Sequence, residues 1–97
     1  MASNLNLKLS NRGRKGAIKR LPSALDIPSS ATIEDVKIAI AKQAGVGDYN
    51  RLGIFNPKTN KIISDRRAVV GQQEDVVSSS ELRVQDLGMQ STTFHQI

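Results

Sequence analysis

The sequence predicts an α+β fold in which one central helix lies across a sheet of four to five strands. Two segments, residues 5–9 and 82–84, alternate apolar and polar side chains, as strands with one buried face do. Between them, residues 33–44 repeat their apolar side chains with the period of a helix. Because a helix of about twelve residues cannot bury such a stripe alone, we expect it to pack on the sheet.

The first two strands are expected to form a hairpin. Leucines at positions 5, 7 and 9 define the first strand, and residues 11–16 contain two glycines that suit a turn. A second run covers residues 17–27 and includes Pro22. Because proline has no N–H to donate to a neighbouring strand, the second strand should either lie at an edge of the sheet or break at Pro22.

The helix is expected to cover residues 33–44. Thr32 can cap its start by accepting a hydrogen bond from the backbone N–H of Asp35, and Gly45 stands where a left-handed cap is favoured at its end. Four apolar residues fall on one narrow stripe of this helix, namely Ile33, Val36, Ile40 and Ala44. We expect the stripe to face the sheet.

Two strands are expected soon after the helix. Residues 52–55 form the third strand, and the composition of residues 56–60 is that of a turn. Ile62 and Ile63 form a short fourth strand.

The remaining segment has a mixed pattern. Residues 68–70 (AVV) are the expected core contacts, and residues 72–75 form a polar excursion with room for one helical turn. Residues 81–87 alternate again and form the last strand.

Length and composition indicate a single domain with a modest core, because the chain has 97 residues of which 38% are hydrophobic. We assign residues 1–88 to this domain and residues 89–97 to a tail without fixed structure. There is no cysteine, so disulfides and thiolate metal sites are excluded. The longest apolar-leaning stretch, residues 36–44, contains lysines and is far shorter than the roughly 20 residues that span a bilayer. We therefore expect a soluble, monomeric chain.

The positive charge is concentrated near the start of the chain. Six basic residues precede the first acid, Asp26: Lys8, Arg12, Arg14, Lys15, Lys19 and Arg20. Such a patch attracts anionic lipid, nucleic acid or an acidic protein surface. The alternative is a solvated hairpin that only keeps the protein soluble. With only three aromatic residues in the chain, base stacking has little support, which argues against nucleic acid.

No catalytic, cofactor-binding or metal-binding residue is predicted. His95 is the only histidine, and Asp65 and the pair Glu74 and Asp75 have no nucleophile or histidine to work with. Lys37 lies beside the apolar stripe of the helix, and burial of an ammonium is costly without a partner. We hypothesise that Lys37 pairs with Asp48 or Asp65 in a structural role.

Four segments resemble ubiquitin and its relatives. Residues 32–37 (TIEDVK) followed by Gly45 and Val46 are similar to the ubiquitin helix, while residues 51–55 (RLGIF), 63–65 (ISD) and 82–84 (LRV) are similar to later parts of that fold. This resemblance implies a ubiquitin-like β-grasp roll with a mixed sheet. The chain lacks the two terminal glycines of conjugated modifiers, and Gly53 stands where ubiquitin has the isoleucine at the centre of its apolar patch.

Residues 82–90 (LRVQDLGMQ) resemble the end of the N-terminal ubiquitin-like domain of very-long-chain enoyl-CoA reductases, with fungal members most similar. In that family an Asp-Leu-Gly-x-Gln stretch leads directly into the first transmembrane helix. Here the resemblance ends at Gln90, because residues 91–97 (STTFHQI) replace the aromatic and aliphatic continuation and cannot enter a bilayer as a helix. The resemblance implies a parent enzyme of fatty acid elongation and lipid metabolism in the endoplasmic reticulum membrane, with this domain on its cytosolic face. The NADPH and lipid sites of the family lie in its membrane domain, so no site residue carries over to this chain.

The expected function is therefore non-catalytic binding of a protein partner, in the elongation complex or elsewhere, or of an anionic membrane surface. The alternative is a free-standing ubiquitin-like adaptor that binds a protein through the sheet face around Leu52 and Ile54. The candidate interaction residues are Arg12, Arg14, Lys15, Lys19, Arg20, Leu52 and Ile54.

Overall fold

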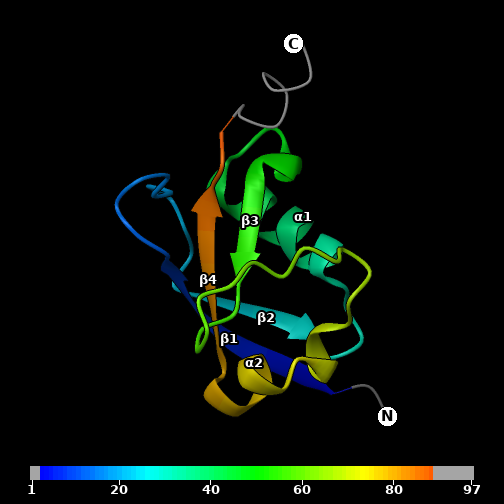
Figure 1. Ribbon diagram of the computed structural model, residues 1–97. Coiled ribbons are helices and arrows are strands. Elements are labelled where there is room, and N and C mark those ends of the chain that lie inside the picture. The colour runs from blue at the N-terminus through cyan, green and yellow to red at the C-terminus, as the bar shows by residue number, and fades with distance from the viewer. Residues whose placement is uncertain (1–2, 89–97) are drawn as a thin grey trace.

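The computed structural model describes residues 3–88, which form one sheet with a long helix packed on one of its faces (Figure 1). The strands are β1 (Asn4–Asn11), β2 (Ala24–Pro28), β3 (Leu52–Phe55) and β4 (Glu81–Asp86). The α-helices are α1 (Ile33–Ala44) and α2 (Glu74–Ser79), and the short 3₁₀ helices are η1 (Tyr49–Arg51) and η2 (Val70–Gln72). No helix of the described part is long and apolar enough to cross a membrane.

The sheet is mixed and has the strand order β2-β1-β4-β3. β1 pairs antiparallel with β2 and parallel with β4, and β3 pairs antiparallel with β4. The first and last strands of the domain are therefore neighbours in the middle of the sheet. The predicted α+β class, with a four-stranded mixed sheet and one main helix, is confirmed, and the arrangement is compatible with a β-grasp roll.

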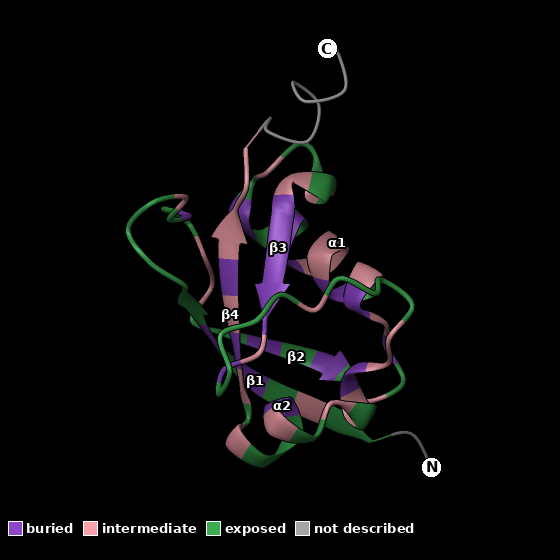
Figure 2. Ribbon diagram, viewed as in Figure 1, coloured by how far each residue is buried: buried purple, intermediate pink, exposed green. Residues whose placement is uncertain are grey.

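The core lies between α1 and the sheet (Figure 2). The predicted stripe of α1 is buried, and Ala41 joins it at 5% exposure. The sheet contributes alternate residues from every strand, namely Leu7, Leu9, Leu25, Ile27, Leu52, Ile54, Leu82 and Val84. A single apolar layer thus holds the helix to the sheet through the hydrophobic effect.

Both ends of α1 are fixed by the predicted caps. The Thr32 hydroxyl accepts a hydrogen bond from the Asp35 N–H at 3.2 Å, and the Asp35 carboxylate accepts the Thr32 N–H at 3.0 Å. Gly45 ends the helix with φ +75°, and its N–H donates to the Ala41 carbonyl. Reciprocal capping of this kind satisfies backbone donors that the first turn leaves free.

The second strand is shorter than expected, because it begins at Ala24 and not at residue 17. Residues 12–23 form a long loop that turns Ile18 into the core at 7% exposure. The Asn11 side chain holds this loop, since its Oδ1 accepts the Ile18 N–H at 2.8 Å. Pro22 lies in this loop, outside β2, and β2 lies at an edge of the sheet, which is one of the two expected outcomes.

The region after β3 also differs from expectation. Ile62 forms only a single bridge with Phe55, so no regular fourth strand exists there. In the segment of residues 68–70, Val70 is fully buried while the other two residues are half-buried. The polar excursion becomes the α-helix α2, which buries Val76. The predicted tail, residues 89–97, lies outside the described residues.

Candidate interaction surface

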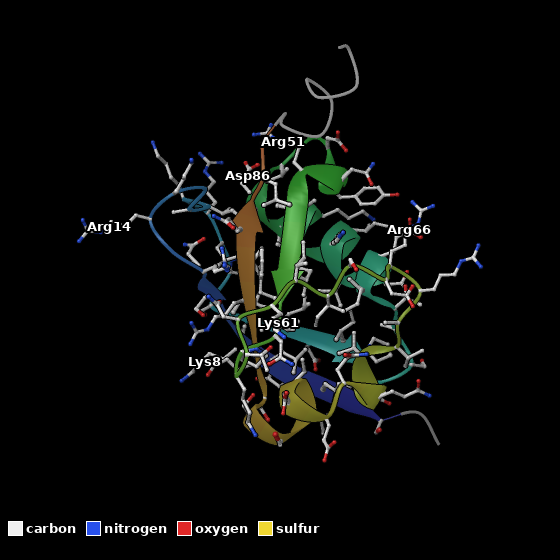
Figure 3. The ribbon with its side chains drawn as sticks, in the orientation of Figure 1. Lys8, Arg14, Arg51, Lys61, Arg66 and Asp86 are labelled. Atoms are coloured by element: carbon white, nitrogen blue, oxygen red, sulfur yellow. The ribbon has the colours of Figure 1, made fainter. Side chains whose placement is uncertain are left out.

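The basic loop, defined as residues 12–20, carries five cationic side chains and no acid: Arg12, Arg14, Lys15, Lys19 and Arg20. It extends from the end of β1 and lies beside the end of β4 (Figure 1). The Arg14 side chain points away from the globule (Figure 3). Arg14 and Lys15 are exposed, and neither forms an ion pair with any described residue.

Backbone contacts fix the basic loop to the end of β4. The Asp86 N–H donates to the Gly16 carbonyl at 2.8 Å, and the Gln85 side chain donates to the Lys15 carbonyl at 2.8 Å. Gly16 has φ +73°, and a Cβ at this position would overlap the carbonyl oxygen of Asp86. Glycine is therefore required here both for the backbone conformation and for the close approach.

Arg12 differs from the other basic residues because its side chain is engaged within the domain. Its guanidinium carbon lies 4.3 Å from the centre of the Phe55 ring, a cation–π contact. The same guanidinium donates to Asn60 at 3.2 Å and to Gln85 at 3.1 Å. We therefore assign Arg12 to positioning the loop against β3 and β4, and leave the binding of a partner to the other four cations.

Lys19 and Arg20 line a shallow hollow of about 400 Å³ between the basic loop and the end of α1. The only acid lining this hollow is Asp86, which binds Arg51 through both carboxylate oxygens at 3.3 and 2.9 Å. Figure 3 shows Arg51 and Asp86 together at this end of the domain. Because Asp86 is already paired, it does little to reduce the positive charge of the loop.

Leu52 and Ile54 do not form a contact surface, so that part of the site prediction is wrong. Their side chains are 1% and 0% exposed. They face the core, and on the opposite face of β3 lie Gly53 and Phe55, which are also buried. A Cβ on Gly53 would lie 3.1 Å from the Leu87 side chain. The outer face of β3 is thus covered by neighbouring side chains of the same domain.

The hypothesis of an acidic partner for Lys37 is also wrong. Asp48 caps η1 by accepting the Asn50 N–H at 3.0 Å, and Asp65 accepts the Arg67 N–H at 3.0 Å. Neither forms an ion pair with Lys37. Burial, and then the nearby Arg66 charge, lower the pKa of Lys37 from 10.5, and Glu34 only partly opposes this.

Replacing Lys37 by methionine is expected to stabilise the domain near neutral pH, by a few tenths of a kcal/mol up to about 1 kcal/mol. The unfolded state binds more protons than the folded state between the lowered pKa of Lys37 and 10.5. The cost of the charge is therefore fully present below the lowered pKa and disappears as the pH rises towards 10.5. Urea unfolding near neutral pH and at about pH 10 should show the stability gap between variant and parent narrowing.

Lys42→Met is the matched control, because Lys42 is an exposed lysine on the same helix. Its substitution should change stability little and by a similar amount at both pH values. A Lys37→Met protein that is less stable than the parent near neutral pH, or a gap that does not change with pH, would contradict the assigned cost.

The acids considered for catalysis are held apart. Asp75 accepts a hydrogen bond from Asn56 at 2.9 Å and lies 3.9 Å from Lys58, while Asp65 belongs to a different loop. Within residues 3–88 no group of three potential metal ligands converges. His95 lies outside the described residues. The sequence did not reveal two contacts: that of Arg12 with Phe55, and the ion pair of Arg51 with Asp86. Each joins residues that are far apart in the chain.

No family model matches the chain, and no curated protein matches it.

Proposed function

We propose that this chain is the non-catalytic, cytosolic ubiquitin-like domain of a very-long-chain trans-2-enoyl-CoA reductase of fatty acid elongation, and that its basic loop binds the anionic surface of the membrane. Support for the family comes from the resemblance of residues 82–90, and support for the binding mode comes from the basic loop. The NADPH that such an enzyme uses would be held by its membrane domain, and no residue of this chain is assigned to it.

One observation carries the membrane proposal: the basic loop is fixed beside the segment that would lead into the membrane. Gly16 and Asp86 are joined by a backbone hydrogen bond of 2.8 Å. The residues that follow are tied down as well, because Leu87 donates to the Arg51 carbonyl at 2.7 Å and Gly88 to the Asp86 carboxylate at 2.7 Å. A transmembrane helix that began a few residues later would place the loop at the bilayer surface.

The charges of the basic loop suit a contact with the membrane that adds to the tether. Each basic residue near an anionic surface contributes on the order of 1 kcal/mol. The four cations not engaged within the domain, Arg14, Lys15, Lys19 and Arg20, would then contribute about 4 kcal/mol. That is weak for a free domain but effective for one that is already tethered, since the tether makes the second contact intramolecular.

Reversing two of these charges in Arg14→Glu, Lys15→Glu is expected to weaken binding to vesicles of phosphatidylcholine with phosphatidylserine by at least about thirtyfold at low salt. Arg12 is left unchanged because its substitution would also disturb Phe55, Asn60 and Gln85. Vesicle co-sedimentation of the 97-residue chain measures the effect, and added salt should release the parent protein.

The matched control is Arg66→Glu, Arg67→Glu, which makes the same change in net charge at exposed residues away from the basic loop. Figure 3 shows Arg66 and Arg14 on opposite sides of the molecule. This control should retain most of the binding. Equal loss in both double variants would mean that only net charge matters, and equal retention would mean that the loop does not bind the membrane.

The alternative function is a free-standing ubiquitin-like adaptor for a protein partner. The two are separated by the genomic sequence downstream of Gln90. This chain itself continues after Gln90 with the mostly polar residues 91–97 (STTFHQI), so the test is whether the genomic sequence also encodes a run of aromatic and aliphatic residues. Such a run supports the reductase, and its absence supports the adaptor.

A further inference from the structure

Arg83 is an unusual cation on the outer face of the sheet, the face opposite α1. It is half-buried in the middle of β4. Its Nε is buried and has no hydrogen-bond partner. A buried N–H without a partner costs stability. Arg83 as a whole is only half-buried, so the rest of its guanidinium can still bind an anion through charge-assisted hydrogen bonds.

The one acid beside Arg83 on this face of β4, Glu81, does not form an ion pair with it. Ser10 of β1 and Phe55 of β3 flank it in the sheet register. Glu81 and Gln85 lie two residues before and two residues after Arg83 on β4. Glu81 forms no ion pair with any described residue, and the side-chain oxygen of Gln85 already accepts a hydrogen bond from Arg12. A carboxylate that satisfies Arg83 would therefore come from outside the domain.

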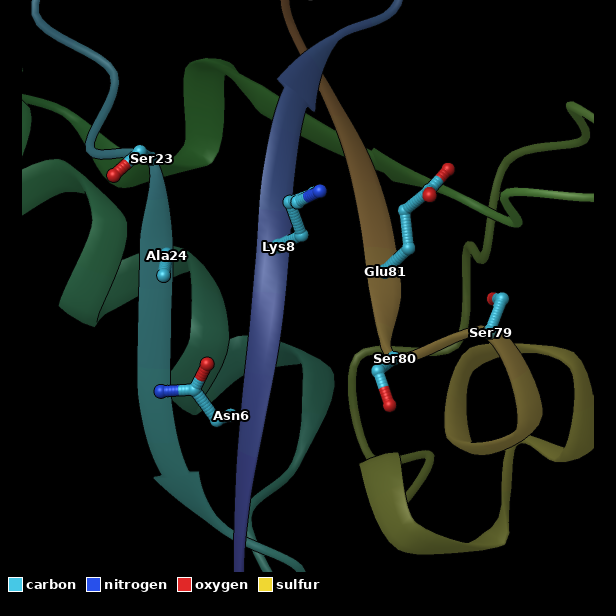
Figure 4. A pocket seen from close by; sticks show the side chains of 7 residues that line it. All are labelled: Asn6, Lys8, Ser23, Ala24, Ser79, Ser80 and Glu81. Carbon is cyan, nitrogen blue, oxygen red and sulfur yellow. The ribbon is translucent and has the colours of Figure 1, made fainter.

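A second cation, Lys8, lies on the same face of the sheet, close enough to Arg83 for one extended segment to contact both. Lys8 of β1 is in register with Glu81, so it stands diagonally from Arg83. Such diagonal neighbours in a sheet are about 7–8 Å apart. Figure 4 shows Lys8 and Glu81 projecting from adjacent strands. They line a hollow of about 420 Å³ together with Ser79, Ser80, one residue each of β1 and β2, and Ser23, which precedes β2.

We propose that this face docks an extended acidic segment of a protein partner, with one carboxylate on Arg83 and a second, two residues away, on Lys8. Alternate side chains of an extended segment point the same way and are about 7 Å apart, which matches the spacing of the two cations. Of the two serines in this hollow, Ser79 donates its hydroxyl to the Asp75 carbonyl at 2.6 Å, so Ser80 is the one whose hydroxyl can donate to a ligand. Glu81 lies in the same hollow as Lys8. Its negative charge would repel a second carboxylate, so the hollow accepts only one carboxylate of the bound segment.

The geometry favours a peptide over a lipid surface. Arg83 is half-buried between its register partners Ser10 and Phe55, and a planar guanidinium suits a bidentate carboxylate. A peptide backbone fixes the distance between successive carboxylates, whereas lipid headgroups move freely. The proposal uses residues other than Arg14 and Lys15, so it does not depend on membrane binding by the basic loop.

The test is a titration of the 15N-labelled 97-residue chain with a capped nonapeptide that has glutamate at alternate positions, followed by NMR. The expected result is a shift of the Arg83 Nε–Hε resonance together with amides of β1 and β4. Arg83→Leu is expected to lower the affinity about tenfold or more. Arg83→Lys, which keeps the charge but loses the fork, should fall between Arg83→Leu and the parent.

Arg67→Leu is the matched control, since it removes an exposed arginine outside the outer face, and it should bind as the parent does. A peptide with glutamine in place of glutamate should not bind. If Arg83→Leu unfolds, the titration of the parent protein is the test: a shift of its Arg83 Nε–Hε resonance with the glutamate peptide supports the proposal, and no shift contradicts it. The proposal is overturned if Arg83→Leu binds equally well, if the glutamine peptide binds equally well, if the shifts fall only on the basic loop, or if anionic vesicles shift the Arg83 resonance as the peptide does.

Discussion

Ile40→Ala is expected to lower the free energy of unfolding by about 3 kcal/mol. Ile40 is fully buried in the middle of α1, where the helix meets the sheet. The substitution removes apolar contact area and leaves a cavity that the surrounding side chains fill only in part. Alanine is the better helix former, so the loss reflects packing alone. A domain of this size has a total stability of about 5–15 kcal/mol, so much of the margin would be lost.

Ile38→Ala is the matched control on the same helix, because Ile38 is only half-buried. Its cost should be at most about 1 kcal/mol. Urea unfolding followed by circular dichroism measures both variants, and the midpoints should separate while the slopes stay alike. Similar losses in the two variants would show that the Ile40 side chain does not contact the sheet as described.

Gly16→Ala is expected to cost about 2 kcal/mol or more and to detach the basic loop from β4. An alanine at φ +73° is strained, and its Cβ would overlap the backbone of Asp86. Relief requires the loop to move away, which breaks the 2.8 Å hydrogen bond between the Asp86 N–H and the Gly16 carbonyl. Hydrogen exchange of the Asp86 amide should therefore speed up more than that of amides in α1.

Gly13→Ala is the control within the same loop, since a Cβ there meets no atom within 4 Å. It should change stability by no more than about 0.5 kcal/mol and leave the Asp86 amide protected. If Gly16→Ala behaves like Gly13→Ala, the loop does not depend on its contact with β4.

The elements with local signals were predicted well, and those set by distant contacts were not. α1 carries its caps and its apolar stripe within fifteen residues, so its bounds were predicted as observed. The start of β2 depends on Ile18 entering the core and on Asn11 holding the loop, which no local pattern reveals. α2 was predicted as one turn at most, because its short polar sequence offers Val76 as its only buried residue.

The candidate site shows the same division. The basic residues were found because charge is visible in composition, yet the role of Arg12 is set by Phe55, which lies far along the chain. Leu52 and Ile54 were predicted to contact a partner, but they are buried, as are all four residues of β3. A strand that is covered on both sides shows no alternation by which its faces could be told apart.

The position of β4 also determines when the chain can fold during synthesis. β4 is the last strand to be made, yet it pairs with both β1 and β3. Until β4 has left the ribosome, β1 and β2 can pair but β3 has no partner strand, and the apolar side chains of α1 are only partly covered. Folding must therefore wait for the whole domain, and closing the long loop between β1 and β4 should make it slower than in helical proteins of equal length. During that interval the nascent chain is a natural substrate for chaperones.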